Sequence, residues 1–118
     1  MDKTNRRGRP FRRGWREFEK GLEAYEAGDL EAALNSYERA ARLGSPYAQL
    51  NLGNMYDDGE GTAPNPVQAV YWYKRAIHHG MAQAATALGI SYKNQGKAHL
   101  ALFWFRRASQ MGDSGAKS

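Results

Sequence analysis

The sequence lacks several features that would define its class directly. Its 118 residues include no cysteine, which excludes a disulfide scaffold, thiol catalysis and cysteine-ligated zinc. No stretch approaches the roughly 18–20 apolar residues of a membrane helix. The basic N-terminus is followed by EFEKGLEAYEAG rather than by an apolar run, so no secretory signal is predicted. We therefore expect one small cytoplasmic domain without a membrane partner.

Acidic residues are scarce at both ends of the chain, and basic residues are scarce in the segment between them. Residues 61–118 contain seven lysines and arginines and a single acid, Asp113, whereas residues 17–60 contain ten acids and three bases. Residues 1–16 again carry seven bases against Asp2. The formal net charge of +5 therefore combines a basic tail, an acidic first half and a basic second half.

A short aromatic and basic phrase recurs along the chain. It is written YWYKRA at 71–76, FWFRRA at 103–108 and, more weakly, NSYERA at 35–40. The copies are 36 and then 32 residues apart, and AQLNLGNMY at 48–56 aligns with AQAATALGISY at 82–92. Self-similarity at this period predicts a stacked array. We expect an all-α domain over 14–112 with about three helix-turn-helix units, near 14–45, 46–81 and 82–112.

Each unit is predicted to contain two helices. Ser45 and Asn65 stand before prolines as capping residues, and Asp29 can cap the helix that follows it. Glycines follow the amphipathic stretches at 28, 44, 80, 96 and 112, where helices commonly end. The expected helices lie near 11–27, 30–43, 46–58, 66–79, 82–95 and 98–111.

Two glycines fall inside predicted helices, where each costs about 1 kcal/mol relative to alanine. Gly53 and Gly89 lie one turn from Tyr56 and Tyr92. We expect the small residue to let the partner helix approach closely, with the tyrosine filling the space beside it. The aromatic phrase is then core rather than a ligand site, with Tyr73 and Phe105 between the helices of a pair and Trp72 and Trp104 directed toward neighbouring units.

The middle unit resembles the Sel1-like repeat, a family similar to the tetratricopeptide repeat. The matching residues are Ala48, Leu52-Gly53, Tyr56, Gly59-x-Gly61, Ala69, Trp72-Tyr73-Lys74, Ala76 and Gly80. The third unit has a shorter turn, and the first departs from the pattern at Lys20 and Ala24. The resemblance implies a right-handed α-α superhelix whose first helices line a concave, partner-binding face, in a scaffold or adaptor that is not an enzyme.

The expected partner-binding residues lie on the first helix of each unit, one face away from the packing set. In the first unit they form a single helical stripe with spacings of 3, 4 and 3. Aromatic residues rimmed by charge suit a helix or an extended peptide, although Trp15 and Phe18 can equally complete the core. The set is Trp15, Phe18, Leu22, Tyr25, Tyr47, Leu50, Asn54, Asp57, Asp58, Gln83, Thr86, Ile90 and Lys93.

The end of the sequence resembles an unfinished repeat. GDSGAKS at 112–118 aligns with the opening of the earlier units, and residues 113–118 are expected to form a flexible tail. No polar capping helix is evident, so we expect exposed parts of Leu100, Phe103, Trp104 and Met111. A second copy or a partner could cover them, or the polar side with Arg106, Arg107 and Gln110 could suffice.

Residues 1–13 form a basic arm that contains Arg6, Arg7, Arg9, Arg12 and Arg13. Three interpretations stay open: a solvated, disordered arm; an arm that folds back on the acidic segment; or an arm that contacts nucleic acid or an acidic protein through salt-sensitive contacts. Phe11 and Trp15 would allow base stacking, but no nucleic-acid-binding motif accompanies them.

The sequence carries no recognisable catalytic or metal-binding pattern. His78 and His79 are adjacent and would point about 100° apart on a helix, which does not suit one ion. Asp57, Asp58 and Glu60 lack the spacing of a calcium loop. We predict no metal, no cofactor and no enzymatic activity. The predicted function is an adaptor or a stoichiometric regulator, such as an immunity protein; the alternative is a nucleic-acid-associated protein anchored by the basic arm.

Overall fold

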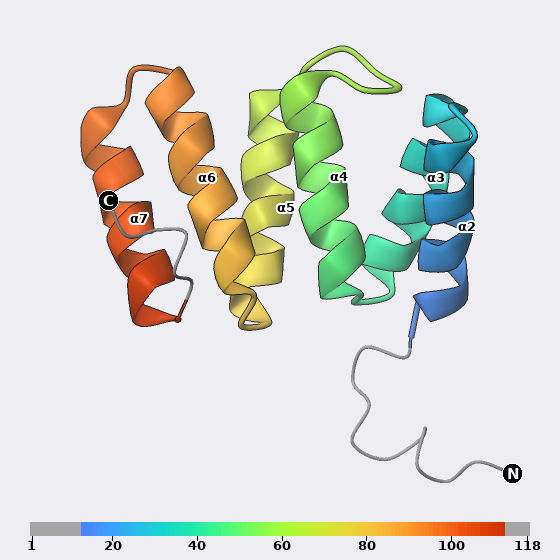
Figure 1. Ribbon diagram of the computed structural model, residues 1–118, viewed down its shortest axis with the longest axis horizontal. Helices are drawn as coiled ribbons and strands as arrows, with labels where there is room; N and C mark the ends of the chain where they lie inside the picture. The colour runs from blue at the N-terminus through green and yellow to red at the C-terminus, as the bar shows by residue number, and fades with distance from the viewer. Residues whose placement is uncertain (1–12, 113–118) are drawn as a thin grey trace, which may run out of the picture.

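The computed structural model describes residues 13–112, which form an all-α solenoid of three helical hairpins (Figure 1). The predicted fold class is confirmed, and the hairpins correspond to the predicted units. Within the described residues the helices are α2 (Trp15–Glu26), α3 (Leu30–Arg42), α4 (Pro46–Asp58), α5 (Pro66–His78), α6 (Ala82–Asn94) and α7 (Ala98–Gln110).

The predicted helix boundaries agree closely, except at the first helix. Residues 11 and 12 lie outside the described part, and Arg13 and Gly14 form a turn before α2. Gly14 has a φ of 85°, and a Cβ there would lie 2.8 Å from the carbonyl oxygen of Ala40. Backbone in the left-handed region packed this closely against α3 requires glycine, so α2 begins at Trp15 rather than at residue 11.

Side-chain caps are present at α3, α4 and α5 and absent at α2, α6 and α7. Asp29, Ser45 and Asn65 accept hydrogen bonds from the backbone N–H three residues later, at 3.1, 3.2 and 3.2 Å respectively. These three predicted caps are confirmed. Met81 and Lys97 stand at the equivalent positions of α6 and α7 and make no side-chain cap bond.

The hairpins stack so that the first helices α2, α4 and α6 form one layer and the second helices α3, α5 and α7 form the other (Figure 1). Each hairpin closes on a glycine and an aromatic ring. A Cβ added at Gly21, Gly53 or Gly89 would lie 2.5, 2.7 or 2.6 Å from the ring of Tyr37, Tyr73 or Phe105. The ring of the second helix therefore fills the space beside the glycine, which corrects the prediction that Tyr56 and Tyr92 fill it.

The apolar core is largest at the N-terminal end of the array. One cluster joins the first two hairpins around Tyr37, Leu52, Met55 and Trp72. Trp72 is only 5% exposed and packs toward the preceding unit, as predicted. The clusters farther along the chain are smaller, and the last contains just Ala85 and Ala108 as fully buried members.

None of the helices between residues 13 and 112 is long and apolar enough to cross a membrane.

Candidate functional site

The side of the molecule formed by α2, α4 and α6, called here the first-helix face, carries most of the predicted partner-binding residues at its surface. The structure divides the predicted set by exposure. Exposed members are Trp15, Leu22, Tyr25, Tyr47, Asp58, Gln83, Ile90 and Lys93; partly buried members are Leu50, Asn54, Asp57 and Thr86; Phe18 is buried.

Phe18 belongs to the core, not to the surface. Its side chain is 8% exposed and is a member of the largest cluster. Its ring centroid lies 5.3 Å from that of Trp15, 5.8 Å from Tyr37 and 6.1 Å from Tyr47. Phe18 therefore supports the two exposed rings of Trp15 and Tyr47 from beneath, and the prediction that it contacts a partner directly is corrected.

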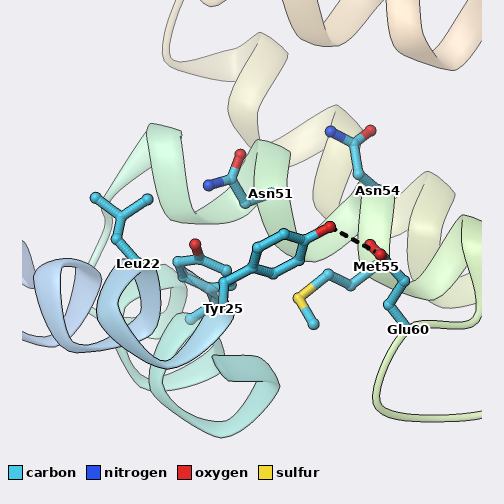
Figure 2. Close-up of a pocket in the computed structure, with 7 residues that line it drawn as sticks. Leu22, Tyr25, Asn51, Asn54, Met55 and Glu60 are labelled. Carbon is cyan, nitrogen blue, oxygen red and sulfur yellow. Dashed lines mark hydrogen bonds between the residues drawn. The ribbon is translucent and has the colours of Figure 1, made fainter. Parts of the chain in front are cut away.

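A pocket of about 240 Å³ opens between α2 and α4 on this face. Figure 2 shows Leu22 and Tyr25 reaching into it from α2, while Asn51, Asn54 and Met55 reach into it from α4. The Tyr37 ring also lines it. Burial raises the pKa of the Tyr37 hydroxyl more than the Asn51 side chain lowers it. The pocket thus combines apolar walls with amide and hydroxyl groups.

The loop after α4 brings a carboxylate to the rim of this pocket. Tyr25 Oη donates a 2.7 Å hydrogen bond to Glu60 Oε2 (Figure 2). The bond, together with burial and the negative charge of Glu60, raises the pKa of the Tyr25 hydroxyl. The phenol therefore stays protonated and keeps donating at neutral pH.

The same loop packs against the start of α3. Gly61 has a φ of 76°, and a Cβ there would lie 2.5 Å from the carbonyl oxygen of Leu30. The loop returns to the array where Asn65 donates a backbone bond of 2.7 Å to the Tyr56 carbonyl. The extra residues of the middle unit thus connect the second hairpin to the first.

A chain of hydrogen bonds continues from the pocket toward the third hairpin. Tyr73 Oη donates to Asn54 Oδ1 at 2.7 Å and lies 3.4 Å from Asp57 Oδ2. Ser91 Oγ donates to Asp57 Oδ1 at 3.0 Å, and Gln95 Nε2 donates to Ser91 Oγ at 3.2 Å. Burial, followed by the nearby carboxylates, raises the pKa of Tyr73. Of the two residues predicted to meet a partner, Asn54 therefore joins the two helices of the second hairpin, and Asp57 joins the second hairpin to the third.

Asp58 lies beside this network at the exposed edge. Burial first, then the charges of Asp57 and Glu60, raises the pKa of its carboxyl. Because like charges disfavour one another, the rim is a place where an added positive charge would be stabilised.

Asn51, Met55 and Glu60 line the pocket and were not predicted as site residues. Asn51 and Met55 lie in the helical stripe next to the predicted one, and their alignment with Ala87 and Ser91 gives no functional signal. Glu60 stands between the two glycines of the loop. That longer loop is a feature specific to the middle unit and is the one signal that could have drawn attention to it.

The third hairpin extends the first-helix face with a different chemistry. Gln83, Ile90 and Lys93 are exposed on α6, and Thr86 is partly buried there. Leu50 on α4 is partly buried against the second core cluster. The face therefore changes from aromatic at α2, through acidic at the end of α4, to mixed and basic at α6.

Most of the basic arm lies outside the described residues. This applies to Arg6, Arg7, Arg9 and Arg12, and to the tail 113–118; Arg13 is described and is exposed. Across residues 13–112, no group of three or more histidine or acidic side chains is arranged to hold a metal ion. His78 and His79 have ring centroids 5.9 Å apart, and burial, then His78 and Arg75, lowers the pKa of His79.

Comparison with known proteins identifies the repeats. The family model described as Sel1 repeat matches residues 11–45, 46–81 and 82–113. A crystal structure of a Sel1 repeat protein from Oxalobacter formigenes superposes with a TM-score of 0.72 and 34% identity, covering 87% of this chain and 46% of that one.

Two curated relatives are much longer proteins. An F-box protein of Arabidopsis thaliana is 36% identical over 70 residues, which are 59% of this chain and 19% of the relative. An exopolysaccharide production negative regulator of Rhizobium leguminosarum bv. viciae is 31% identical over 72 residues, which are 61% of this chain and 27% of the relative. This chain therefore corresponds to a small part of each.

Proposed function

The chain belongs to the Sel1 repeat family, and on that premise we propose that its first-helix face binds a segment of another protein without catalysing a reaction. Sel1 repeat proteins are protein-interaction and regulatory modules. The observation that carries the proposal is the pocket between α2 and α4, on the same helices that present the exposed rings of Trp15 and Tyr47.

The size of the pocket favours a side chain over a metabolite. Its volume of about 240 Å³ is below the roughly 300–1,000 Å³ that sites for small molecules occupy. The walls from Leu22, Met55 and Tyr37 can contact an aliphatic stem, while the amides of Asn51 and Asn54 can bond to a polar group. One anchor residue of a bound segment fits this combination.

The rim charge favours a segment that carries lysine or arginine. Glu60 accepts one bond from Tyr25, and a carboxylate can accept more than one. Asp58 adds a second negative charge at the same edge. Carboxylates that repel each other gain from a cation placed between them, and charge complementarity of this kind also raises the association rate.

The action would be stoichiometric. A bound segment buries surface on its own protein, so the module either brings two proteins together or covers a functional surface of one of them. The Rhizobium leguminosarum relative is a negative regulator of exopolysaccharide production, which supports the regulatory form of the proposal. We propose the same class of role here, with a different and unidentified partner.

The test is affinity capture on the full chain from source-cell lysate, with nuclease treatment and high salt in parallel. We expect one protein in near-stoichiometric amount that resists nuclease. Leu22→Lys and Tyr47→Ala should each weaken its binding by about tenfold or more, because they remove anchoring contacts. Both residues are exposed, so the fold should be retained.

Val67→Lys is the matched control, since Val67 is 79% exposed on α5 and lies away from the first-helix face. Its binding should equal that of the wild type. Equal loss in all three variants, or no loss in any, would reject the first-helix face as the binding site. Recovery of nucleic acid alone, lost at high salt and on deletion of residues 1–13, would instead favour the basic arm as the functional element.

A further inference from the structure

A cleft of about 420 Å³ lies between the second helices α3 and α5, in the layer opposite the first-helix face (Figure 1). This α3–α5 cleft is lined by Arg42, Gln68, Tyr71, Trp72 and Arg75. The four residues from α5 follow one another at helical spacing, so they lie on a single face of that helix. Both helices pack against the helix before and the helix after them, so the cleft belongs to the interior of the array.

Arg75 lacks the carboxylate partner that its counterpart in the first hairpin has. Arg39 stands at the same repeat position on α3 and is paired with Glu17 of α2 at 3.2 Å. In the second hairpin the position of Glu17 is taken by Gln49, which is fully buried and donates to the Ala41 carbonyl. Among residues 13–112, Arg75 therefore forms no ion pair, and its charge faces the cleft uncompensated.

Arg42 brings a second guanidinium to the cleft from the last turn of α3. It donates one hydrogen bond of 2.6 Å to Glu38 on the same helix. A guanidinium carries five N–H donors, so this bond leaves most of them for a ligand. None of the described residues that line the cleft is acidic. Two arginines at one site suit the oxygens of a phosphate group, which accept paired N–H bonds.

The aromatic residues of the cleft supply a ring surface and an unpaired donor. Tyr71 is 49% exposed, and the guanidinium carbon of Arg75 lies 6.0 Å from its ring centroid. The Trp72 ring packs beside it, with ring centroids 4.8 Å apart and planes at 83°. Trp72 is 5% exposed, and its indole Nε1 has no hydrogen-bond partner among the described residues. Because buried polar groups are almost always bonded, this donor indicates a missing acceptor beside the cleft.

We propose that the α3–α5 cleft binds a mononucleotide, with the phosphate between Arg42 and Arg75 and the base on the Tyr71 ring. An aromatic ring stacks on any base, and the Gln68 amide offers a donor and an acceptor for the base edge. The volume of about 420 Å³ lies within the roughly 300–1,000 Å³ of small-molecule sites. The cleft and the pocket on the first-helix face share no residue, so nucleotide binding does not depend on the protein partner proposed above.

The test titrates the full chain with adenosine monophosphate and follows nitrogen–proton correlation spectra. The chain has three tryptophans and therefore three indole N–H signals. The signal of Trp72 is identified by its loss in Trp72→Phe. We expect this signal to move during the titration, because the ligand supplies an acceptor beside the indole, while the signal of Trp104 on α7 stays in place.

Variants of the cleft should weaken the binding of adenosine monophosphate. Arg42→Ala and Arg75→Ala should each do so by about tenfold or more, since each removes charged donors to the phosphate. Tyr71→Ala should have an effect of similar size because base stacking is lost. All three side chains are exposed, so the fold should be retained. Arg107→Ala is the matched control: Arg107 is exposed at the position of Arg75 on α7, and this variant should bind as the wild type does.

Four outcomes would overturn the proposal. A Trp72 signal that does not move would show that the cleft is empty. Equal loss in Arg107→Ala and Arg75→Ala would show general attraction to a basic surface. Inorganic phosphate that binds as tightly as the nucleotide would show that the Tyr71 ring takes no part. A single-stranded oligonucleotide or a glutamate-rich peptide that moves the Trp72 signal when the mononucleotide does not would identify a nucleic acid or an acidic protein as the occupant.

Discussion

The second and third hairpins are built on the same register but are stabilised to different degrees. Both helices of the second hairpin have side-chain caps at Ser45 and Asn65, whereas α6 and α7 have none. The ring that closes the second hairpin, Tyr73, is 1% exposed and bonded to Asn54. Its counterpart Phe105 is partly buried and has no hydroxyl.

The difference shows how a repeat array distributes its tasks. Within the described residues the second hairpin packs against a neighbour on each side, through α3 and α6, whereas the third packs against the second alone. The tightly held second hairpin shapes the pocket. Three pairs of variants test this contrast, and a seventh variant tests the charge at the edge of the pocket.

The largest effect is expected where the glycines meet the rings. In Gly53→Ala the new Cβ would lie 2.7 Å from the Tyr73 ring. Overpacking costs about 1–3 kcal/mol, against a gain of about 1 kcal/mol in helix propensity. Because the Tyr73 ring is fully enclosed and cannot move aside, the cost is at the upper end of this range, and we expect the free energy of unfolding in urea to fall by about 2 kcal/mol.

Gly89→Ala is the matched variant, with the Phe105 ring 2.6 Å from the new Cβ. Because Phe105 is only partly buried, the ring can move, and we expect a loss of about 1 kcal/mol or less. Equal losses in both variants would show that the third hairpin is as rigid as the second.

The hydroxyl of Tyr73 should have the next largest effect. Tyr73→Phe removes the bond to Asn54 and the contact with Asp57, at a cost of about 1 kcal/mol. The reverse change, Phe105→Tyr, should not stabilise the chain. In the third hairpin Ile90 and Lys93 occupy the positions of Asn54 and Asp57, and neither side chain can accept a hydrogen bond from the new hydroxyl. A gain in the urea midpoint for Phe105→Tyr would contradict this account.

An added cap should make the third hairpin more like the second. Lys97 precedes α7 without a cap bond, so Lys97→Asp should raise the free energy of unfolding by about 0.5–1 kcal/mol. Asn65→Ala should lower it by about 1 kcal/mol. If amide hydrogen exchange in α7 is no slower in Lys97→Asp than in the wild type, the missing cap does not limit the stability of this hairpin.

The smallest effect concerns the pH dependence of stability. The pKa of Asp58 is raised in the folded protein, so the folded state binds its proton more tightly than the unfolded state does. The ionised carboxyl therefore opposes folding, and stability declines as pH rises from the ordinary aspartate pKa through the raised value. Asp58→Asn should reduce that decline in the free energy of unfolding, measured by urea unfolding across about pH 3–7. The same pH profile in the variant and the wild type would contradict this assignment to Asp58.

The fold could be predicted from sequence because the pattern of one helical hairpin occurs three times along the chain. Ser45, Asn65 and Asp29 mark helix starts through local hydrogen bonds, and each bond depends on residues close in sequence. The glycine and aromatic pairs recur at one spacing, so the hairpin geometry follows from the register. These signals are local or periodic, which is why sequence patterns contain them.

The pocket could be predicted only in part. Leu22 and Tyr25 were identified from a helical stripe, but Glu60 reaches Tyr25 across 35 residues through a loop whose path no periodicity specifies. For Phe18 the sequence left two interpretations open, a partner contact on the stripe of Trp15 and Leu22 or a place in the core. The rings of Tyr37 and Tyr47 around it show that it is in the core. The contact of Glu60 with Tyr25 depends on how the first and second hairpins pack together, and the pattern within each repeat does not specify that packing.

The loop at residues 59–65 also has a mechanical consequence. The joint between the first two hairpins is held by helix packing and by the loop resting on Leu30, whereas the joint between the last two relies on helix packing and the Asp57–Ser91 bond. We expect the first joint to be stiff and the second to be compliant, so that bending would widen the α4–α6 spacing and leave the α2–α4 spacing unchanged. Electron spin resonance distances between labels on α2 and α4 should then be narrower in distribution than those between α4 and α6. Bending of the array would therefore occur at the joint between the second and third hairpins. The place of this hinge follows from the longer loop of the middle unit, which makes one repeat four residues longer than the next.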